Sequence, residues 1–169
     1  MSGMPDRWER LWAPHRMAYL KGEGRPLETN DVSCPFCEIP KKADREGLVV
    51  YRGVHACVVM NLYPYNPGHV LVCAYRHVPD LTDLTDDERN EIIALSAHAM
   101  KTIRKVSQPQ GFNLGMNQGE ISGAGVAAHI HQHIVPRWQG DANFMPIIGQ
   151  TKVLPELLIT TRDELAKAW

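Results

Sequence analysis

The sequence predicts an α+β fold in which an antiparallel sheet of about five strands is covered by one long helix, with extra N- and C-terminal helices. Three observations lead to this prediction. Short Val-rich segments bounded by Gly, Asn or Pro recur along the chain, one long segment has apolar residues at helical spacing, and a Gly-rich loop joins the last two extended segments.

The length and charge of the chain restrict the class of protein. With 169 residues we expect a single domain over 1–169, made of an N-terminal arm (1–32), a core (33–138) and a C-terminal extension (139–169). The formal net charge is −1, which disfavours nucleic acid and membrane surfaces as partners. No apolar run approaches the roughly 20 residues of a membrane span, and the N-terminus lacks the apolar centre of a signal peptide, so we expect a cytoplasmic protein.

The N-terminal arm carries a partly helical pattern over residues 6–20, which Pro14 interrupts. We expect its aromatic residues to pack on the core, and the alternative is an aromatic wall for a dimer or a nucleobase. At the other end of the chain, residues 154–169 are expected to form a helix. Before it, Asp141, Asn143 and Phe144 are loop residues that would fix the tail.

Cys34 and Cys37 form a Cys-x-x-Cys pair, which is half of a tetrahedral zinc site. The chain has no second such pair, so histidines are the candidates for the other ligands, and His77 and His129 are well placed. A redox pair is the alternative, but it normally opens a helix after a strand of a parallel fold, and no such pattern surrounds Cys34. We therefore favour structural zinc, because four protein ligands would close the site.

Three strands are predicted at 47–51, 54–60 and 69–74, each rich in Val. Cys57 and Cys73 lie inside them and are expected to be small core residues rather than nucleophiles. The connection between the second and third strands contains two prolines and a glycine, and such a stiff loop can hold a ligand-binding side chain in place.

The long helix is predicted over 82–106. Thr85 and Glu88 make a capping box at its start, and apolar residues recur at helical spacing at Ile92, Leu95, Ala99, Ile103 and Val106. His98 lies close to this stripe and is expected to be a packed or solvated side chain.

Residues 111–117 alternate as in a strand and lead into a Gly-rich loop at 118–125. Gly119, Gly123 and Gly125 lie where a backbone that approaches a phosphate closely would need residues without Cβ. The order of strand, Gly-rich loop and strand predicts a β-hairpin with a phosphate-sized loop.

Three histidines alternate within residues 129–138. On a strand, His129, His131 and His133 would all project from one face. A row of imidazoles near neutral pH supplies a nucleophile, a proton for a leaving group and positive charge for an anion, which suits phosphoryl chemistry. A bare His-x-His-x-His also occurs in metal-binding tracts and on solvated strands, but the glycines upstream favour the phosphoryl interpretation.

The sequence His-Ile-His-Gln-His-Ile-Val-Pro-Arg at 129–137 resembles the signature of the histidine triad (HIT) family of nucleotide hydrolases and transferases. The family's even positions are usually apolar, so Gln132 departs from the pattern. The segments Leu-Trp-Ala-Pro-x-Arg-Met-Ala-Tyr and Arg-Trp-x-Gly-Asp-x-Asn-Phe resemble a bacterial branch of the family that includes diadenosine tetraphosphate phosphorylases. The resemblance covers nearly the whole chain.

The resemblance implies a HIT-like fold and roles for the histidines. Several zinc-containing members bind the metal with two cysteines and two histidines, which map onto Cys34, Cys37, His77 and His129. His131 would be the nucleophile, and His133 would bind phosphate oxygens.

The resemblance also implies the substrate contacts. Asn61 would contact the ribose, with a turn residue that bonds its own backbone as the alternative. Asn117 would hold phosphate oxygens. Family members carry a hydroxyl or amide side chain shortly before the first triad histidine, but residues 123–128 offer no side-chain donor. Phosphate would then be held by Asn117, His133 and the backbone N–H groups of Gly123, Gly125 and Val126.

We therefore expect nucleotidyl transfer through a nucleotidyl-histidine intermediate, in the phosphorolysis or hydrolysis of dinucleoside polyphosphates such as diadenosine tetraphosphate. The alternatives are a hydrolase of adenosine phosphoramidates or other mononucleotide conjugates, a non-catalytic nucleotide-binding sensor, and a metal-storage protein. The expected cofactor is structural zinc, with no organic cofactor. The expected partners are the nucleotide, an acceptor that is water or inorganic phosphate, and a second copy in a homodimer, because by resemblance two such domains usually pair.

Overall fold

The computed structural model describes residues 34–141 and 156–169, which belong to one compact unit. The predicted helix at 6–20 lies outside the described residues, as do Asn143 and Phe144. Within the described part of the chain, no helix is both long and apolar enough to cross a membrane.

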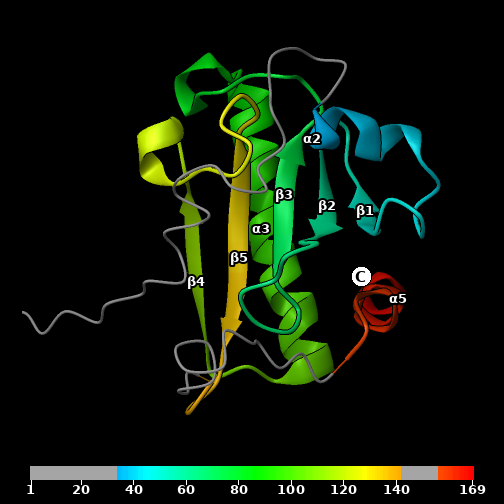
Figure 1. Cartoon of the computed structure of the whole chain (residues 1–169). Coiled ribbons are helices and arrows are strands. Elements are labelled where there is room, and N and C mark those ends of the chain that lie inside the picture. The colour runs from blue at the N-terminus through cyan, green and yellow to red at the C-terminus, as the bar shows by residue number, and fades with distance from the viewer. Residues whose placement is uncertain (1–33, 142–155) are drawn as a thin grey trace, which may run out of the picture. The chain divides into compact units, whose positions relative to one another are not determined.

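Five strands form one antiparallel sheet in the order β1-β2-β3-β5-β4 (Figure 1). The predicted α+β class and five-stranded antiparallel sheet are confirmed. β5, which carries two of the three histidines, lies between β3 and β4 and is therefore held by backbone hydrogen bonds along both edges. The strands are β1 (Val49–Arg52), β2 (Ala56–Met60), β3 (Val70–Ala74), β4 (Gly111–Met116) and β5 (His131–Arg137).

The first two strands differ from the predicted ranges at the turn between them. Residues 54 and 55 were expected in the second strand, but their backbone N–H groups donate to the carboxylate of Glu91 instead, at 2.8 Å for Val54. This side chain therefore caps the hairpin turn, and β2 begins only at Ala56.

The long helix α3 (Asp86–Ser107) begins with the predicted capping box. Thr85 Oγ1 accepts from the backbone N–H of Glu88, and the Glu88 carboxylate accepts from the N–H of Thr85. The helix starts later than the predicted residue 82, because Leu81–Asp83 form a separate 3-10 turn, η2.

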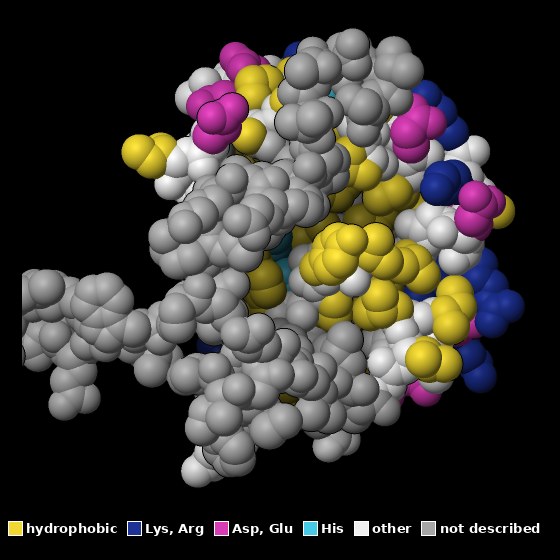
Figure 2. Space-filling view, viewed as in Figure 1, with side chains coloured by type: hydrophobic (Ala, Val, Ile, Leu, Met, Phe, Trp, Pro, Cys, Tyr) yellow, Lys and Arg dark blue, Asp and Glu magenta, His cyan; other side chains and the backbone are white. Residues whose placement is uncertain are grey.

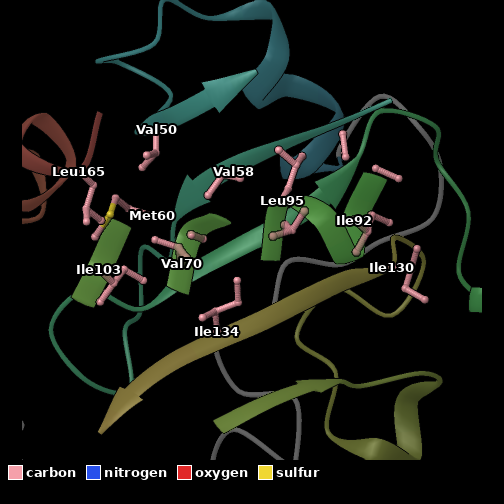
Figure 3. Close-up of a cluster of buried hydrophobic side chains, with 14 of the residues drawn as sticks. Val50, Val58, Met60, Val70, Ile92, Leu95, Ile103, Ile130, Ile134 and Leu165 are labelled. Atoms are coloured by element: carbon pink, nitrogen blue, oxygen red, sulfur yellow. The ribbon is translucent and has the colours of Figure 1, made fainter. Parts of the chain in front are cut away.

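One face of the sheet, here called the α3 face, packs against α3 (Figure 1). Helix α5 (Leu158–Ala168) also packs on α3 and on β1, and it begins after the predicted residue 154 because Leu157 is extended. Figure 3 shows apolar side chains from the sheet and both helices pointing toward one another: Val50, Val58, Met60, Val70, Ile92, Leu95, Ile103, Ile130, Ile134 and Leu165. His98 is an exposed side chain whose ring stacks on that of Trp169, with centroids 4.5 Å apart, which agrees with the expected packed or solvated side chain.

The opposite face, here called the α2 face, packs against the short helix α2 (Pro35–Glu38), which η1 (Ile39–Lys41) follows. Cys57 and Cys73 are register partners on this face and are almost fully buried. Burial raises the pKa of the Cys57 thiol to about 11 and that of the Cys73 thiol well above its ordinary value. Both remain protonated small core residues, as predicted.

Candidate active site and metal centre

The histidine segment enters the sheet later than predicted. β5 begins at His131, and Ile130 donates its N–H to the carbonyl of Val78 at 2.7 Å instead of extending the strand. His129 lies just before the strand, with its imidazole Nε2 2.9 Å from the carbonyl oxygen of Ala74 at the end of β3.

All three histidines nevertheless lie on the α2 face, as the alternation predicted. The register partners of His131 and His133 are Cys73 and Leu71. Both belong to the buried cluster on the α2 face, here called the α2 cluster, which consists of Cys34, Phe36, Val49, Cys57, Val59, Leu71 and Cys73. The Phe36 ring lies against two of the histidines, with centroid distances of 4.6 Å to His131 and 5.5 Å to His129. In Figure 2, histidine surface is visible beside apolar side chains near the middle of the molecule.

The structure brings the four predicted metal ligands together. One ligand atom from each of the four lies within 4.8 Å of all the others. Sγ of Cys34 is 3.4 Å and Sγ of Cys37 is 3.5 Å from Nδ1 of His129, while Nδ1 of His77 is 3.2 Å from Sγ of Cys37. Sulfur and nitrogen ligands of tetrahedral zinc are about 3.5 Å apart when the metal–ligand bonds are about 2.3 and 2.0 Å long. The donor set therefore fits zinc.

The orientation of His129 also fits metal binding. Because a carbonyl oxygen can only accept, the contact with Ala74 places the proton of His129 on Nε2. Nδ1 is then unprotonated and faces both cysteine sulfurs. A metal-binding histidine typically donates its other N–H to a carbonyl or carboxylate in this way, which fixes the ring.

His131 has the tautomer of a nucleophile. Its Nδ1 lies 2.8 Å from the backbone carbonyl of His129, so Nδ1 carries the proton and Nε2 keeps its lone pair. The side chain is 5% exposed, and burial lowers its pKa, which keeps the ring neutral.

His69 also belongs to this group of histidines, although the sequence pattern predicted it only as the start of a strand. The ring is completely buried, and its Nε2 lies 3.0 Å from Nδ1 of His133. The N–H of Tyr65 donates to Nδ1 of His69 at 3.0 Å, so the proton of His69 is on Nε2 and points at His133. The signal that could have identified it is a Pro-Gly-His sequence at the end of a stiff loop.

His133 receives that hydrogen bond on Nδ1 and therefore carries its own proton on Nε2. Partial burial lowers the pKa of His133 to about 4. Near neutral pH the ring is uncharged and offers one N–H donor.

Asn61 lies at the edge of this group of histidines. Its side chain makes the bond to the nearby backbone that was the alternative to a ribose contact. Its Oδ1 accepts from the backbone N–H of Tyr63 at 3.0 Å, and its Nδ2 lies 3.3 Å from Nδ1 of His69. The side chain is thus next to the histidines whether or not it also contacts a ligand.

The connection between β4 and β5 forms the predicted hairpin loop. It contains the short 3-10 turn η3 (Glu120–Ser122), flanked by Gly119 and Gly123 with φ of +75° and +82°, a conformation that favours glycine. A Cβ at either glycine would meet nothing within 4 Å, so the backbone conformation is what requires them. Val126 packs against the α2 cluster, and Asn117 is half-buried at the start of the same connection.

The chain is similar to several known proteins. A HIT domain family model matches residues 42–140. The AP-4-A phosphorylase of Mycobacterium tuberculosis is 49% identical over 170 residues, covering 99% of this chain and 87% of the relative. The asymmetrical bis(5'-nucleosyl)-tetraphosphatase of Schizosaccharomyces pombe is 38% identical over 93 residues, covering 55% of this chain and 50% of that protein.

Among solved structures, a Zn-bound histidine triad family protein from Mycobacterium smegmatis is similar with a TM-score of 0.66 and 23% identity, covering 82% of this chain and 94% of that one. It shares the fold described above. Together with the family match and the near full-length relative, this establishes that the chain belongs to the HIT domain family.

Proposed function

We propose that the protein transfers a nucleotidyl group from a dinucleoside polyphosphate such as diadenosine tetraphosphate to water or inorganic phosphate. The observation that carries this proposal is the pair of fixed tautomers, with a lone pair on Nε2 of His131 and a proton on Nε2 of His133. The name and 49% identity of the M. tuberculosis relative support the substrate class.

In the first step, Nε2 of His131 attacks the α-phosphorus of the substrate. An N–P bond forms while the bond from phosphorus to the bridging oxygen breaks, and the remainder leaves as a nucleoside polyphosphate. The imidazole gains positive charge as the N–P bond forms. The carbonyl of His129, which already accepts from Nδ1–H, stabilises that charge.

His133 stabilises the phosphate oxygens as negative charge develops on them. Its Nε2–H is the donor, because Nδ1 of the neutral ring accepts from His69. The side chain of Asn117 and the backbone N–H groups of Gly125 and Val126 provide further donors. The N–H of Gly123 was expected to contribute as well, but it donates to the carbonyl of Glu120 at 3.1 Å and closes the turn.

In the second step, an oxygen of the acceptor attacks phosphorus and the N–P bond breaks, which regenerates His131. Diadenosine tetraphosphate gives ATP in the first step and then AMP with water or ADP with inorganic phosphate. The M. tuberculosis relative, which is named a phosphorylase, supports phosphate as acceptor.

Cys34, Cys37, His77 and His129 would hold a zinc ion that links α2 to the end of the sheet. With four protein ligands the ion has no open position, so its contribution is structural. Zinc would also keep Nδ1 of His129 occupied and the strand entrance fixed.

A homodimer across the β4 edge is part of the proposal. β4 is an edge strand, and Leu114 on it and Ile93 on α3 are 47% and 63% exposed. Beside them is a hollow of about 430 Å³ lined by Leu81, Arg89, Ile92, Ile93, Met116, Gln118 and Gln132. An exposed edge strand is a template for pairing with another chain. Leu114→Lys should therefore give monomers in sedimentation. Leu157→Lys, which replaces another exposed leucine, should leave the dimer intact.

The cytoplasm is the proposed location. Its reducing conditions would keep the four cysteines as the thiols seen in the structure, two of them available to zinc.

The deciding experiment incubates the protein with diadenosine tetraphosphate, with and without inorganic phosphate, and maps any trapped nucleotidyl adduct by mass spectrometry. ADP that depends on phosphate supports phosphorolysis, and AMP with ATP supports hydrolysis. His131→Ala should abolish both turnover and adduct, while His98→Ala, which removes a histidine outside the site, should preserve them. An adduct on a residue other than His131 would refute the mechanism. So would the absence of any adduct with a substrate that the protein converts.

A further inference from the structure

We infer that Asp141 is a positioning residue for His133, acting through Asn66 and the loop at 61–69. The inference rests on the proposed function, because it concerns how the phosphate-binding proton of His133 is aimed. The structure provides a continuous set of contacts from the Asp141 carboxylate to the His133 ring.

Asp141 is fixed just beyond the end of β5. Arg137 donates to both carboxylate oxygens, with Nε 2.6 Å from Oδ2 and Nη2 2.8 Å from Oδ1, and the N–H of Trp138 donates to Oδ2 at 3.1 Å. The Arg137 guanidinium holds the pKa of the Asp141 carboxyl well below its ordinary value. The guanidinium also donates to Asn113 on β4, so the pair is anchored to two strands.

Asn66 connects this carboxylate to the loop. Its Nδ2 lies 2.7 Å from Oδ2 of Asp141 and 2.9 Å from the carbonyl oxygen of Pro136 on β5. Both acceptors belong to the end of the strand that carries the histidines. The middle of the loop is therefore tied to β5.

The backbone of the loop transmits the position of Asn66 to His69. The carbonyl of Asn66 accepts from the N–H of His69 at 3.2 Å, and Gly68 between them has φ of +73°, which makes a tight turn. The carbonyl of His69 accepts from Asn61 at 3.0 Å. With its backbone held on both sides, His69 places Nε2 3.0 Å from Nδ1 of His133.

The alternative is that Asp141 only fixes the chain that follows β5. The two roles differ in what they affect. A structural role would lower stability without altering His133, whereas a positioning role would alter the His133 tautomer and depend on His69.

The test compares Asp141→Asn, His69→Ala, which removes the donor to His133, and the double variant in the full chain. A displacement of about 1 Å at a reacting group costs up to about 100-fold in rate, so we expect Asp141→Asn to lower kcat by about 10- to 100-fold with little change in KM. In the His69→Ala background the same change should have no further effect, because its route to His133 is already broken. Equal effects in both backgrounds would overturn the inference.

A second readout does not depend on turnover. Nitrogen-15 NMR of wild-type protein should show His133 protonated on Nε2, and both single variants should show a mixture of tautomers. Wild-type protein with this tautomer but no activity on any nucleotide would refute the proposed function and leave the positioning role standing. An unchanged tautomer in a folded Asp141→Asn variant would refute the positioning role.

Two further variants guard against misfolding. Asn66→Ala keeps the Arg137–Asp141 pair and should reproduce the loss of kcat and the tautomer change. Asp163→Asn removes a carboxylate paired with Arg45 and Arg162 and should leave kcat and the His133 signals unchanged.

Discussion

Nε2 of His69 lies 3.0 Å from Nδ1 of His133, and this contact joins the loop before β3 to the strand that carries His131 and His133. Because Tyr65 donates to the other nitrogen of His69, the direction of the hydrogen bond is fixed. The proton with which His133 would bind phosphate is thus set by a residue outside the triad.

Replacing His69 by Ala should reduce turnover. Without its donor, Nδ1 of His133 can take up the proton, and part of the population then presents a lone pair rather than an N–H to the phosphate. We expect kcat to fall by about 10-fold or more, which corresponds to about 1.4 kcal/mol of transition-state stabilisation. Steady-state kinetics with diadenosine tetraphosphate measures this, and an unchanged kcat in a folded variant would contradict it.

The partly buried His133 should make the fold sensitive to mild acid. Its pKa falls from an ordinary value of 6.5 to about 4 in the folded chain. Between these values the unfolded chain binds a proton that the folded chain does not, so the free energy of unfolding decreases as pH falls, by at most about 1.4 kcal/mol per pH unit. Below about pH 4 this contribution no longer changes with pH.

Urea unfolding between about pH 7 and about pH 5 measures the dependence, since histidine titrates in this range. The control is His133→Asn, which removes the titrating group. Its free energy of unfolding should depend less steeply on pH than that of wild type. The difference in slope should be at most about 1.4 kcal/mol per pH unit, which corresponds to one proton. Parallel curves for the two proteins would argue against a neutral His133 in the folded chain.

Zinc removal should destabilise the protein, because the metal would link Cys34 and Cys37 to histidines on other elements. We expect one zinc per chain by elemental analysis, and a lower melting temperature after chelation. Cys37→Ser should lose the metal, whereas Cys57→Ala, a cysteine in the sheet outside the cluster, should keep it. Several metals per chain would instead favour the metal-storage alternative.

The parts of the site that could be predicted were those with local patterns. Cys34 and Cys37 are a short-range motif, and the period of a strand places His131 and His133 on one face. The position of His129, whose side chain donates to the carbonyl of Ala74 just before β5 begins, could not be predicted. That carbonyl is 55 residues away along the chain. The link from Asn66 to Asp141 spans 75 residues and was missed for the same reason.

The carboxylate of Glu91 should stabilise the fold without contributing to activity. It accepts from the backbone N–H groups of Val54 and His55 at the turn between β1 and β2, which is remote in sheet order from β5. Glu91→Ala leaves these two donors without their acceptor, so we expect the free energy of unfolding to fall by about 1–3 kcal/mol. Glu164→Ala, which removes an exposed carboxylate on α5, should change it by no more than about 0.5 kcal/mol. Urea unfolding compares the two variants, and kcat should match wild type in both. A loss of turnover in a fully folded Glu91→Ala variant would show that the β1–β2 hairpin influences the histidines across the sheet.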